Sequence, residues 1–203
     1  MTRKNILLIG GGGHAHSCIE VILSTTDYGV AGIVDPTYQV DTPQDVLGFP
    51  LWGRDEDLPT LRQRFDYALV TVGQIKTAAL RMKLFELLKQ LEFALPPIIA
   101  STAVVSRYAQ IGEGTVVMHQ AVIDAGTVVG ANCIVNTGAL AAHDCNIGDH
   151  SHLSLHAVIC GNVRIGKCCY IGANATVVQD CNVDDYTFVR AADLVKPPTF
   201  VSA

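Results

Sequence analysis

The chain has 203 residues, of which 49% are hydrophobic and 16% charged, enough apolar material for one large domain or two small ones. Its net charge of −5 argues against nucleic acid or an anionic membrane surface as the main partner. No apolar run approaches the ~20 residues of a transmembrane helix, so we expect no membrane partner and a cytoplasmic location. The seven cysteines include no Cys-x-x-Cys motif and are expected to be reduced apolar fillers.

Strands alternate with helices through residues 1–99, which predicts a Rossmann-like α/β half domain with a parallel sheet. The predicted strands are 6–9, 30–34 and 67–72, and the predicted helices are 16–23 and 75–91. Residues 41–59, rich in Pro, Gly and Asp, are expected to form a long connecting loop. The pair Pro96-Pro97 marks the boundary with a second domain, residues 100–203.

A glycine-rich turn follows the first predicted strand in the pattern Gly10-x-Gly12-x-x-Ala15. Such glycines let the backbone approach a phosphate at a helix N-terminus, and Asp35 lies where a carboxylate can reach a ribose hydroxyl. The alternative is that the glycines only permit close packing of helix and sheet. Because only about one βαβαβ half precedes the second domain, a mononucleotide or nucleotide sugar fits better than a dinucleotide. His14, at the helix start, is expected to contact whatever the turn binds.

From residue 105 to residue 189 an aliphatic or small residue recurs at every sixth position. This period matches neither an α-helix nor a single strand, and it predicts a parallel β-helix with three hexads per triangular coil. The recurring residues are Val105, Ile111, Val117, Ile123, Val129, Val135, Ala141, Ile147, Leu153, Ile159, Ile165, Ile171, Val177, Val183 and Val189. Small residues four positions later are expected to fill inward corners. Glycines directly after the marker are expected at bends that need a permissive φ; they are Gly112, Gly130, Gly148, Gly166 and Gly172.

Three hexads make one coil, so residues 18 apart stack at the same corner, and His143 is expected beneath Gly161, about 4.8 Å away along the stack. This pairing suits acyl transfer. The imidazole would take a proton from an incoming amine or hydroxyl, and the Gly161 amide would hold a thioester carbonyl or its oxyanion. Asp144 would fix the imidazole tautomer if its carboxylate reaches the other ring nitrogen.

The other histidines on the predicted β-helix favour ordinary roles. His119 is expected to be a solvated surface residue. His150, His152 and His156 suggest a three-histidine metal site as the alternative, but their hexad offsets differ and no acidic partner is evident, so we expect no metal. His152 is instead a candidate for lining the groove of an acyl donor.

Four stretches spread along nearly the whole chain form a recognisable set: residues 9–14 (Ile-Gly-Gly-Gly-Gly-His), 136–148 (containing His-Asp-Cys-Asn-Ile-Gly), 151–154 (Ser-His-Leu-Ser) and 161–166 (Gly-Asn-Val-Arg-Ile-Gly). Together they resemble the bacterial nucleotide-sugar acetyltransferases. That family includes UDP-4-amino-sugar N-acetyltransferases of bacillosamine synthesis, perosamine N-acetyltransferases and sialic acid O-acetyltransferases. The resemblance implies a left-handed parallel β-helix for residues 100–203, a homotrimer, and acetyl-coenzyme A as co-substrate.

Position by position, the resemblance implies that His143 is the general base and that Asp144 raises its basicity. It implies acetyl-coenzyme A contacts at His152, Gly161 and Ala173. It implies contacts with a nucleotide amino-sugar at Gly12, Gly13, His14, Asp35, Pro36 and Gly73. The expected reaction is transfer of acetyl to the amine of a UDP-4-amino-4,6-dideoxy sugar.

Three other functions remain open at this stage. Sialic acid O-acetylation would use the same base on a hydroxyl. A zinc hydratase resembling γ-type carbonic anhydrase would share the β-helix, although the nucleotide-binding half argues against it. A non-catalytic scaffold would bind the sugar nucleotide without releasing a thiol from acetyl-coenzyme A.

Overall fold

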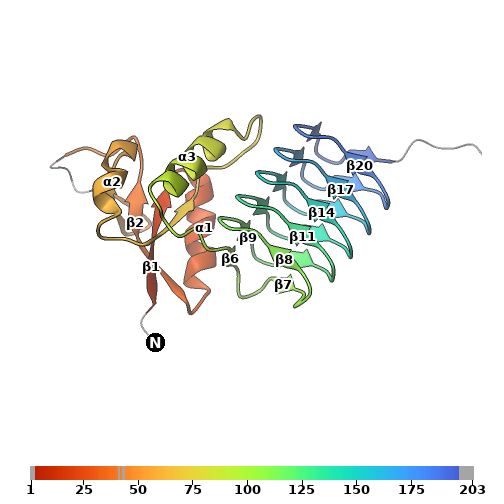
Figure 1. Ribbon diagram of the computed structural model, residues 1–203, viewed down its shortest axis with the longest axis horizontal. Coiled ribbons are helices and arrows are strands. Elements are labelled where there is room, and N and C mark those ends of the chain that lie inside the picture. The colour runs from red at the N-terminus through yellow and green to blue at the C-terminus, as the bar shows by residue number, and fades with distance from the viewer. Residues whose placement is uncertain (1–2, 41, 43, 197–203) are drawn as a thin grey trace, which may run out of the picture.

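The computed structural model describes residues 3–40, 42 and 44–196 and has two parts, an α/β unit and a three-sided prism of stacked strands (Figure 1). The α/β unit lies at one end, and the coils of the prism extend away from it. The predicted fold class, an α/β unit followed by a left-handed parallel β-helix, is confirmed. Among the described residues, none of the helices has the length and apolarity that crossing a bilayer requires.

The α/β unit is built on a five-stranded sheet with the strand order β3-β4-β2-β1-β5. Its central strands are nearly continuous apolar runs because other elements cover both faces of the sheet. The elements of this unit are β1 (Lys4–Ile9), α1 (Gly13–Leu23), β2 (Tyr28–Val34), β3 (Asp45–Val46), β4 (Phe49–Gly53), η1 (Asp55–Asp57), α2 (Leu58–Leu61), β5 (Tyr67–Val70) and α3 (Ala79–Gln90).

Strand β1 sends alternate side chains into two opposite cores. Ile6 and Leu8 pack in the core that contains α1, whereas Leu7 packs in the core that contains α3. The α1 core also takes in Val116 and Ile134 from the prism. Helix α1 therefore lies between the sheet and the prism and fixes one part against the other.

The prediction of a long loop over residues 41–59 was wrong in the described part of that segment. Strands β3 and β4 form an antiparallel hairpin, and β4 extends the main sheet beside β2. Leu47 and Gly48, between the two strands, both have positive φ, as a two-residue hairpin turn requires. Trp52 Nε1 donates a hydrogen bond to the carbonyl of Ala31 at 2.9 Å, which ties β4 to β2. Residues 41 and 43 lie outside the described residues.

Parallel strands pair along the prism with a shift of 18 residues, as in Val122 to Leu140 and His152 to Tyr170. The predicted coil of three hexads is therefore confirmed. Face 1 consists of β7 (Val104–Val105), β10 (Val122–Ile123), β13 (Leu140–Ala141), β16 (Val158–Ile159), β19 (Thr176–Val177) and β22 (Leu194–Val195). Face 2 consists of β8 (Gln110–Ile111), β11 (Val128–Val129), β14 (Asn146–Ile147), β17 (Arg164–Ile165) and β20 (Asn182–Val183). Face 3 consists of β6 (Ile98–Ile99), β9 (Val116–Val117), β12 (Ile134–Val135), β15 (His152–Leu153), β18 (Tyr170–Ile171) and β21 (Phe188–Val189).

Side chains of the six-residue repeat and of the small column fill the prism interior, where nearly all are fully buried. The glycines after the markers have a different role from the one expected. Gly112 and Gly148 do not have positive φ; a Cβ added to either would lie 2.5 Å from the backbone of the next coil. These positions need glycine because neighbouring coils approach closely. Positive φ instead recurs two residues further on, at every sixth residue from Gly114 to Ala192.

Candidate active site

His143 and Asp144 lie at the corner where the chain leaves face 1 after β13 and enters face 2 at β14. The Nδ1 atom of His143 lies 2.9 Å from Oδ2 of Asp144. Adjacent residues usually point apart, but Asp144 is one of the residues with positive φ (60°), and this turn brings its carboxylate back to the ring. A carboxylate only accepts hydrogen bonds, so Nδ1 carries the proton and Nε2 of the neutral imidazole presents a lone pair.

Two glycines enclose this pair from the coils above and below. A Cβ built on Gly161 would lie 2.6 Å from both Cε1 and Nε2 of His143, so the imidazole packs directly on the Gly161 backbone. On the other side, the Asp144 carboxylate packs on Gly126 in the same way. The structure thus brings together three residues predicted from the sequence: His143, Asp144 and Gly161.

The remaining polar groups at this corner suit an acyl-transfer site. The N–H of Gly161 donates no hydrogen bond within the described part of the chain, whereas the next amide, that of Asn162, bonds the carbonyl of His143 at 3.0 Å. The side chains of His143 and Asp144 are 61% and 67% exposed. The Nε2 atom of His143 therefore faces an accessible corner, and the unbonded amide of Gly161, itself a buried residue, lies next to it.

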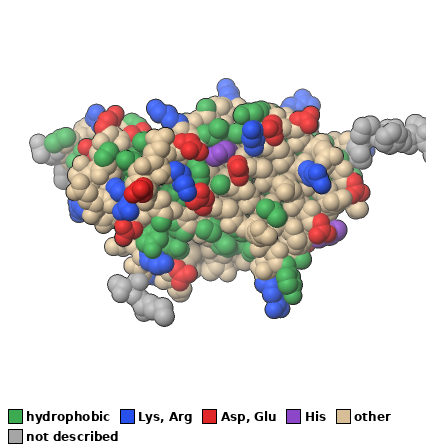
Figure 2. Space-filling model, in the orientation of Figure 1, with side chains coloured by type: hydrophobic (Ala, Val, Ile, Leu, Met, Phe, Trp, Pro, Cys, Tyr) green, Lys and Arg blue, Asp and Glu red, His purple; other side chains and the backbone are tan. Residues whose placement is uncertain are grey.

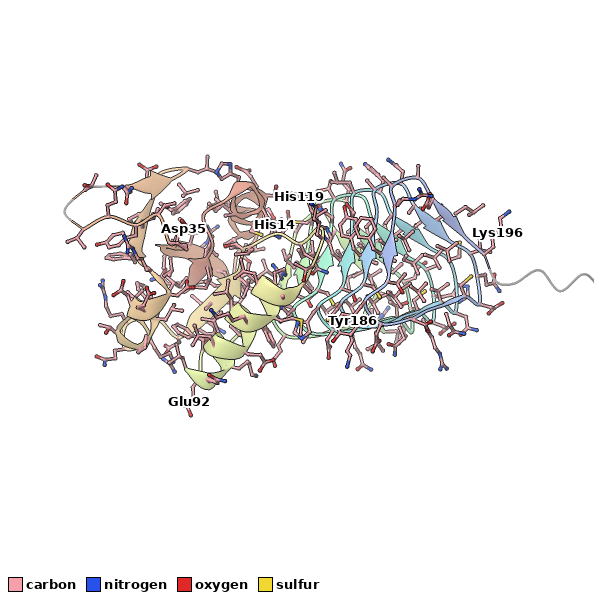
Figure 3. The ribbon with its side chains drawn as sticks, turned by 90° about the horizontal axis from the view of Figure 1, so that it is seen from above. His14, Asp35, Glu92, His119, Tyr186 and Lys196 are labelled. Carbon is pink, nitrogen blue, oxygen red and sulfur yellow. The ribbon has the colours of Figure 1, made fainter. Side chains whose placement is uncertain are left out.

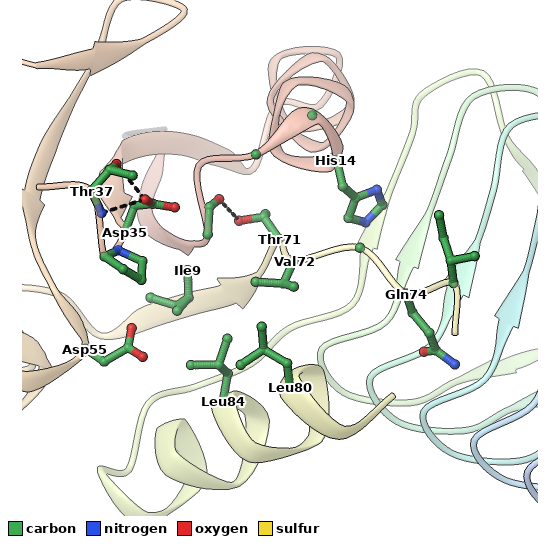
Figure 4. A pocket seen from close by; sticks show the side chains of 16 residues that line it. Ile9, His14, Asp35, Thr37, Asp55, Thr71, Val72, Gln74, Leu80 and Leu84 are labelled. Carbon is green, nitrogen blue, oxygen red and sulfur yellow. Dashed lines mark hydrogen bonds between the residues drawn. The ribbon is translucent and has the colours of Figure 1, made fainter. Parts of the chain in front are cut away.

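A second site is a pocket of about 690 Å³ at the carboxyl ends of β1 and β5 (Figure 4). It is lined by all the residues expected to contact the nucleotide sugar, namely Gly12, Gly13, His14, Asp35, Pro36 and Gly73. Ligands of open α/β sheets bind at this edge. Figure 3 shows His14 near the junction of the α/β unit with the prism and Asp35 further out. The pocket therefore extends from Asp35, within the α/β unit, toward the prism.

The glycines of the turn have two different roles: one permits close packing and two leave space for a ligand. Gly10 has positive φ (108°), and a Cβ there would lie 2.6 Å from Val72, so this glycine serves close packing. A Cβ on Gly12 or Gly13 would meet nothing within 4 Å. No side chain caps the N-terminus of α1, whose first turn also contains no acidic residue. Space and free backbone amides are therefore available at the positive end of a helix, an arrangement that favours phosphate.

Asp35 fixes the outer part of the pocket. Its Oδ2 accepts a hydrogen bond from the N–H of Gly11 at 2.7 Å, and its Oδ1 accepts one from the backbone N–H of Thr37 at 2.9 Å and another from the hydroxyl of that residue. Burial alone would raise the pKa of Asp35, but these hydrogen bonds outweigh burial and lower it. Asp35 is therefore a carboxylate at neutral pH.

The inner end of the pocket is neutral and incompletely hydrogen-bonded. Burial lowers the pKa of His14 to about 3, and its Nε2 is buried without a partner in the described structure. Gln74 is 3% exposed, and its Oε1 is likewise buried and unpaired there. The sequence motifs did not single out Gln74 as a contact; only its position next to Gly73 pointed to it. Unpaired buried polar atoms are uncommon in native proteins, and these two suit a polar ligand.

His152 joins the pocket to the prism. From β15 on face 3, its Nδ1 donates to the Gln74 carbonyl at 2.7 Å, and its Nε2 lies 3.2 Å from the amide nitrogen of Asn136. Burial lowers the pKa of His152 to about 4, so the ring is neutral. Ala173 lies at a third place, the corner between β18 on face 3 and β19 on face 1. Within one chain, His152 and Ala173 therefore do not share the corner of His143.

The remaining histidines are separate from one another. His150 lies 3.0 Å from Asn132 through Nδ1, and half-buried His119 bonds Thr102 through Nδ1 at 2.7 Å. No group of three or more His, Cys, Asp or Glu side chains suited to a metal ion occurs in residues 3–40, 42 and 44–196. On the face visible in Figure 2, acidic and basic side chains are interspersed.

Comparison with known proteins assigns the family. The model of the PglD N-terminal domain matches residues 5–88. The acetyltransferase domain of PglB from Neisseria gonorrhoeae FA1090 is 34% identical, with a TM-score of 0.82 over 96% of this chain and 92% of that one. The same domain in complex with acetyl coenzyme A has a TM-score of 0.83, at 34% identity over 96% and 93% of the two chains.

A variant of perosamine N-acetyltransferase from Caulobacter crescentus, in complex with CoA and GDP-perosamine, is 30% identical, with a TM-score of 0.75 over 93% of this chain and 94% of that one. No match was found among curated proteins. Identity of 30% or more over nearly the full length of both chains confirms the resemblance that the sequence motifs indicated. The chain belongs to the bacterial nucleotide-sugar acetyltransferase family and is an acetyltransferase.

Proposed function

We propose that this protein transfers acetyl from acetyl-coenzyme A to the amine of a nucleotide-linked amino sugar, most specifically a UDP-4-amino-4,6-dideoxy sugar. The observation that carries the proposal is the position of the His143 imidazole, oriented by Asp144 and packed against the backbone of Gly161. Further support comes from the relatives, one in complex with acetyl coenzyme A and another with CoA and GDP-perosamine. The pocket beside α1 has the volume and the backbone amides for a nucleotide sugar.

In the proposed mechanism the neutral sugar amine attacks the thioester carbonyl carbon directly. As the C–N bond forms, Nε2 of His143 accepts the proton that the amine loses. The N–H of Gly161 donates to the oxyanion of the tetrahedral intermediate. The intermediate collapses with cleavage of the C–S bond, and the thiolate leaves and takes up the proton. The Asp144 carboxylate stabilises the imidazolium while it holds that proton.

The nearest cysteine does not provide a covalent route. The Cys145 thiol is buried in the prism interior and donates a hydrogen bond to the carbonyl of Cys160 at 3.0 Å. Burial raises the pKa of Cys145, so little thiolate is present at neutral pH. Direct transfer to the amine needs no such nucleophile.

Within one chain, the nucleotide pocket and the His143 corner lie on opposite sides of the prism. The α/β unit packs on face 3 through α1 and Gln74, whereas His143 lies at the corner between faces 1 and 2, across the prism. We propose a homotrimer in which the pocket of one chain faces the His143 corner of its neighbour. Residues 1–99 then bind the nucleotide sugar through Gly12, Gly13, His14, Asp35, Pro36 and Gly73. Residues 100–203 bind acetyl-coenzyme A through His152, Gly161 and Ala173, and the protein acts in the cytoplasm.

Mixed trimers test this arrangement. Gly12→Phe should block the pocket without disturbing the fold, because a side chain there points into open space, and His143→Ala removes the base. Each variant alone should be inactive. Trimers refolded from equal amounts should regain about a quarter of wild-type turnover, since one interface in four then joins an intact pocket to an intact base. No recovery would mean that both sites act within a single chain.

The substrate class is tested by thiol release from acetyl-coenzyme A with a panel of acceptors. We expect turnover with UDP-linked and GDP-linked 4-amino sugars, and N-acetylated products by mass spectrometry. Turnover with sialic acid and none with any nucleotide amino sugar would overturn the proposal in favour of O-acetylation. Binding of the sugar nucleotide without thiol release would indicate a non-catalytic scaffold.

A further inference from the structure

Arg81, in α3, is a buried cation directly behind the wall of the nucleotide pocket. It is 1% exposed. Its Nη1 donates to the carbonyls of Val70 (3.0 Å) and Val72 (2.5 Å), and its Nη2 donates to Oδ1 of Asn132 at 2.7 Å. Thr71 and Val72 line the pocket on the opposite side of the same backbone segment. The guanidinium group is therefore one layer of backbone away from the pocket.

No anion neutralises this charge in the described structure. Arg81 belongs to none of the ion pairs there, and its Nε has no hydrogen-bond partner. Burial raises the pKa of the nearby Cys18 and Cys133 thiols to about 12, so both are neutral. Burial lowers the pKa of Arg81 itself to about 10, and the group stays protonated at neutral pH. The interior thus retains a full positive charge held only by carbonyl and amide oxygens.

The field of this charge reaches the pocket. Burial is the largest cause of the low pKa of His14, which lines the pocket, and the Arg81 charge is the second largest. The same charge also lowers the pKa of His152. Both imidazoles are therefore neutral at pH 7, and neither adds a positive charge to that of Arg81. The pocket lining itself contains two carboxylates, Asp35 and Asp55, and neither Lys nor Arg. A nucleotide sugar brings a diphosphate to a lining whose charged side chains are both acidic, so the buried charge would add to the attraction of the free amides at the start of α1.

An unpaired charge in the interior is destabilising, so its presence beside a ligand site calls for a functional explanation. We propose that Arg81 is the specificity-determining charge of the pocket: acting through the backbone of residues 70–72 and not by contact, it selects nucleoside diphosphates over neutral nucleosides. The proposal rests on the proposed function in taking a nucleotide-linked sugar as the ligand. Coulombic attraction is strong here because little water separates the guanidinium from the pocket.

Calorimetric titration of the full-length protein with UDP, uridine, GDP and guanosine tests this role. Arg81→Gln removes the charge and keeps an amide donor for the strand carbonyls, whereas Arg81→Lys keeps the charge. We expect Arg81→Gln to weaken UDP or GDP binding at least about 10-fold and nucleoside binding less than about 3-fold, and Arg81→Lys to keep most of the preference. Lys89→Gln, which removes an exposed cation at the C-terminal end of the same helix, away from the pocket lining, is the matched control and should leave the preference unchanged.

Equal losses of diphosphate and nucleoside affinity in Arg81→Gln would show a purely structural role and overturn the inference. Unchanged diphosphate preference would overturn it as well. A wild-type protein that binds neither UDP nor GDP would overturn the proposed function and the inference with it. The wild-type titration distinguishes failure of the proposed function from failure of the inference, because it shows by itself whether the protein binds UDP or GDP.

A measurement on the wild type alone decides the matter if the Arg81 variants do not fold. Dissolved ions cannot enter the space between a buried charge and its ligand, so the affinity ratio of diphosphate to nucleoside should fall less than about 3-fold between about 50 mM and about 500 mM salt. A fall of about 10-fold or more would assign the preference to exposed charges and overturn the role of Arg81.

Discussion

Gly161→Ala tests the packing of the proposed base most sharply, because it removes no catalytic group and changes only the space beside the imidazole. The added Cβ would lie 2.6 Å from Cε1 and Nε2 of His143, whereas ordinary contacts between such atoms begin at about 3.5 Å. The imidazole must therefore move by about 1 Å, and a displacement of that size costs roughly 10²-fold in rate. We expect kcat to fall by about this factor.

Thiol release gives kcat, and thermal unfolding reports whether the prism is intact. Gly29→Ala is a matched control, because a Cβ there meets its nearest neighbour, Arg3, at an ordinary 3.7 Å. The double variant His143→Ala with Gly161→Ala tells whether the loss of kcat in Gly161→Ala comes from displacement of the imidazole or from another effect of the methyl group. Removing the imidazole leaves room for the new methyl group, so the double variant should be no slower than His143→Ala alone.

Near-wild-type turnover of Gly161→Ala would refute the reasoning, since the ring would then not need its present position. Additive losses in the double variant would also refute it, because the methyl group would be acting on something other than the imidazole.

Two further predictions concern Asp144 and the buried histidines. Asp144→Asn can still accept a hydrogen bond from Nδ1 but lacks the charge that stabilises the imidazolium. We therefore expect kcat in the thiol-release assay to fall about 10-fold, less than the ~10²–10⁴-fold loss caused by removing a base. A loss as large as that of His143→Ala would contradict this role. His14 and His152 have folded pKa values of about 3 and about 4, against 6.5 for a histidine in an unfolded chain. Below pH 6.5 the unfolded chain therefore binds protons that the folded chain does not, and the free energy of unfolding should fall by about 1.4 kcal/mol per pH unit for each histidine down to about pH 4. Urea unfolding from pH 7 to pH 5 measures this slope, which His152→Gln should reduce; an unchanged slope would contradict the burial of that ring.

Periodicity explains why the prism could be predicted from the sequence. Each hexad places two side chains inward, and three hexads close a triangular coil of 18 residues, so the alignment of His143 with Gly161 follows from counting alone. The contact between His143 and Asp144 does not, because it depends on the positive φ of Asp144. Eight of the fourteen corner residues with positive φ are Gly, Asn or Asp, which tolerate it, so residue type carried a signal that the sequence reasoning did not use.

The other features that could not be predicted from the sequence, namely the β3–β4 hairpin and the burial of Arg81, depend on tertiary contacts. The β3–β4 hairpin was hidden because its strands are short and its turn, Leu47-Gly48, has no standard hairpin pair. Arg81 reads as an ordinary helix residue, and only the docking of α3 on the prism, which places it against Asn132 51 positions away, buries it. Gly12, His14 and Asp35 were found because a strand, a glycine turn and an acid stand at the expected spacing, whereas Gly13, Pro36 and Gly73 came only from the family resemblance. Gln74 has no such motif.

The most direct test of the account is a comparison of wild type with His143→Ala in two measurements, single-turnover acetyl transfer and equilibrium binding of each substrate. If the imidazole is the base, the transfer rate should fall at least ~10²-fold while the Kd values for acetyl-coenzyme A and for the nucleotide sugar change less than about 3-fold. A transfer rate close to that of wild type would contradict the account, as would a loss of binding large enough to explain the whole loss of rate.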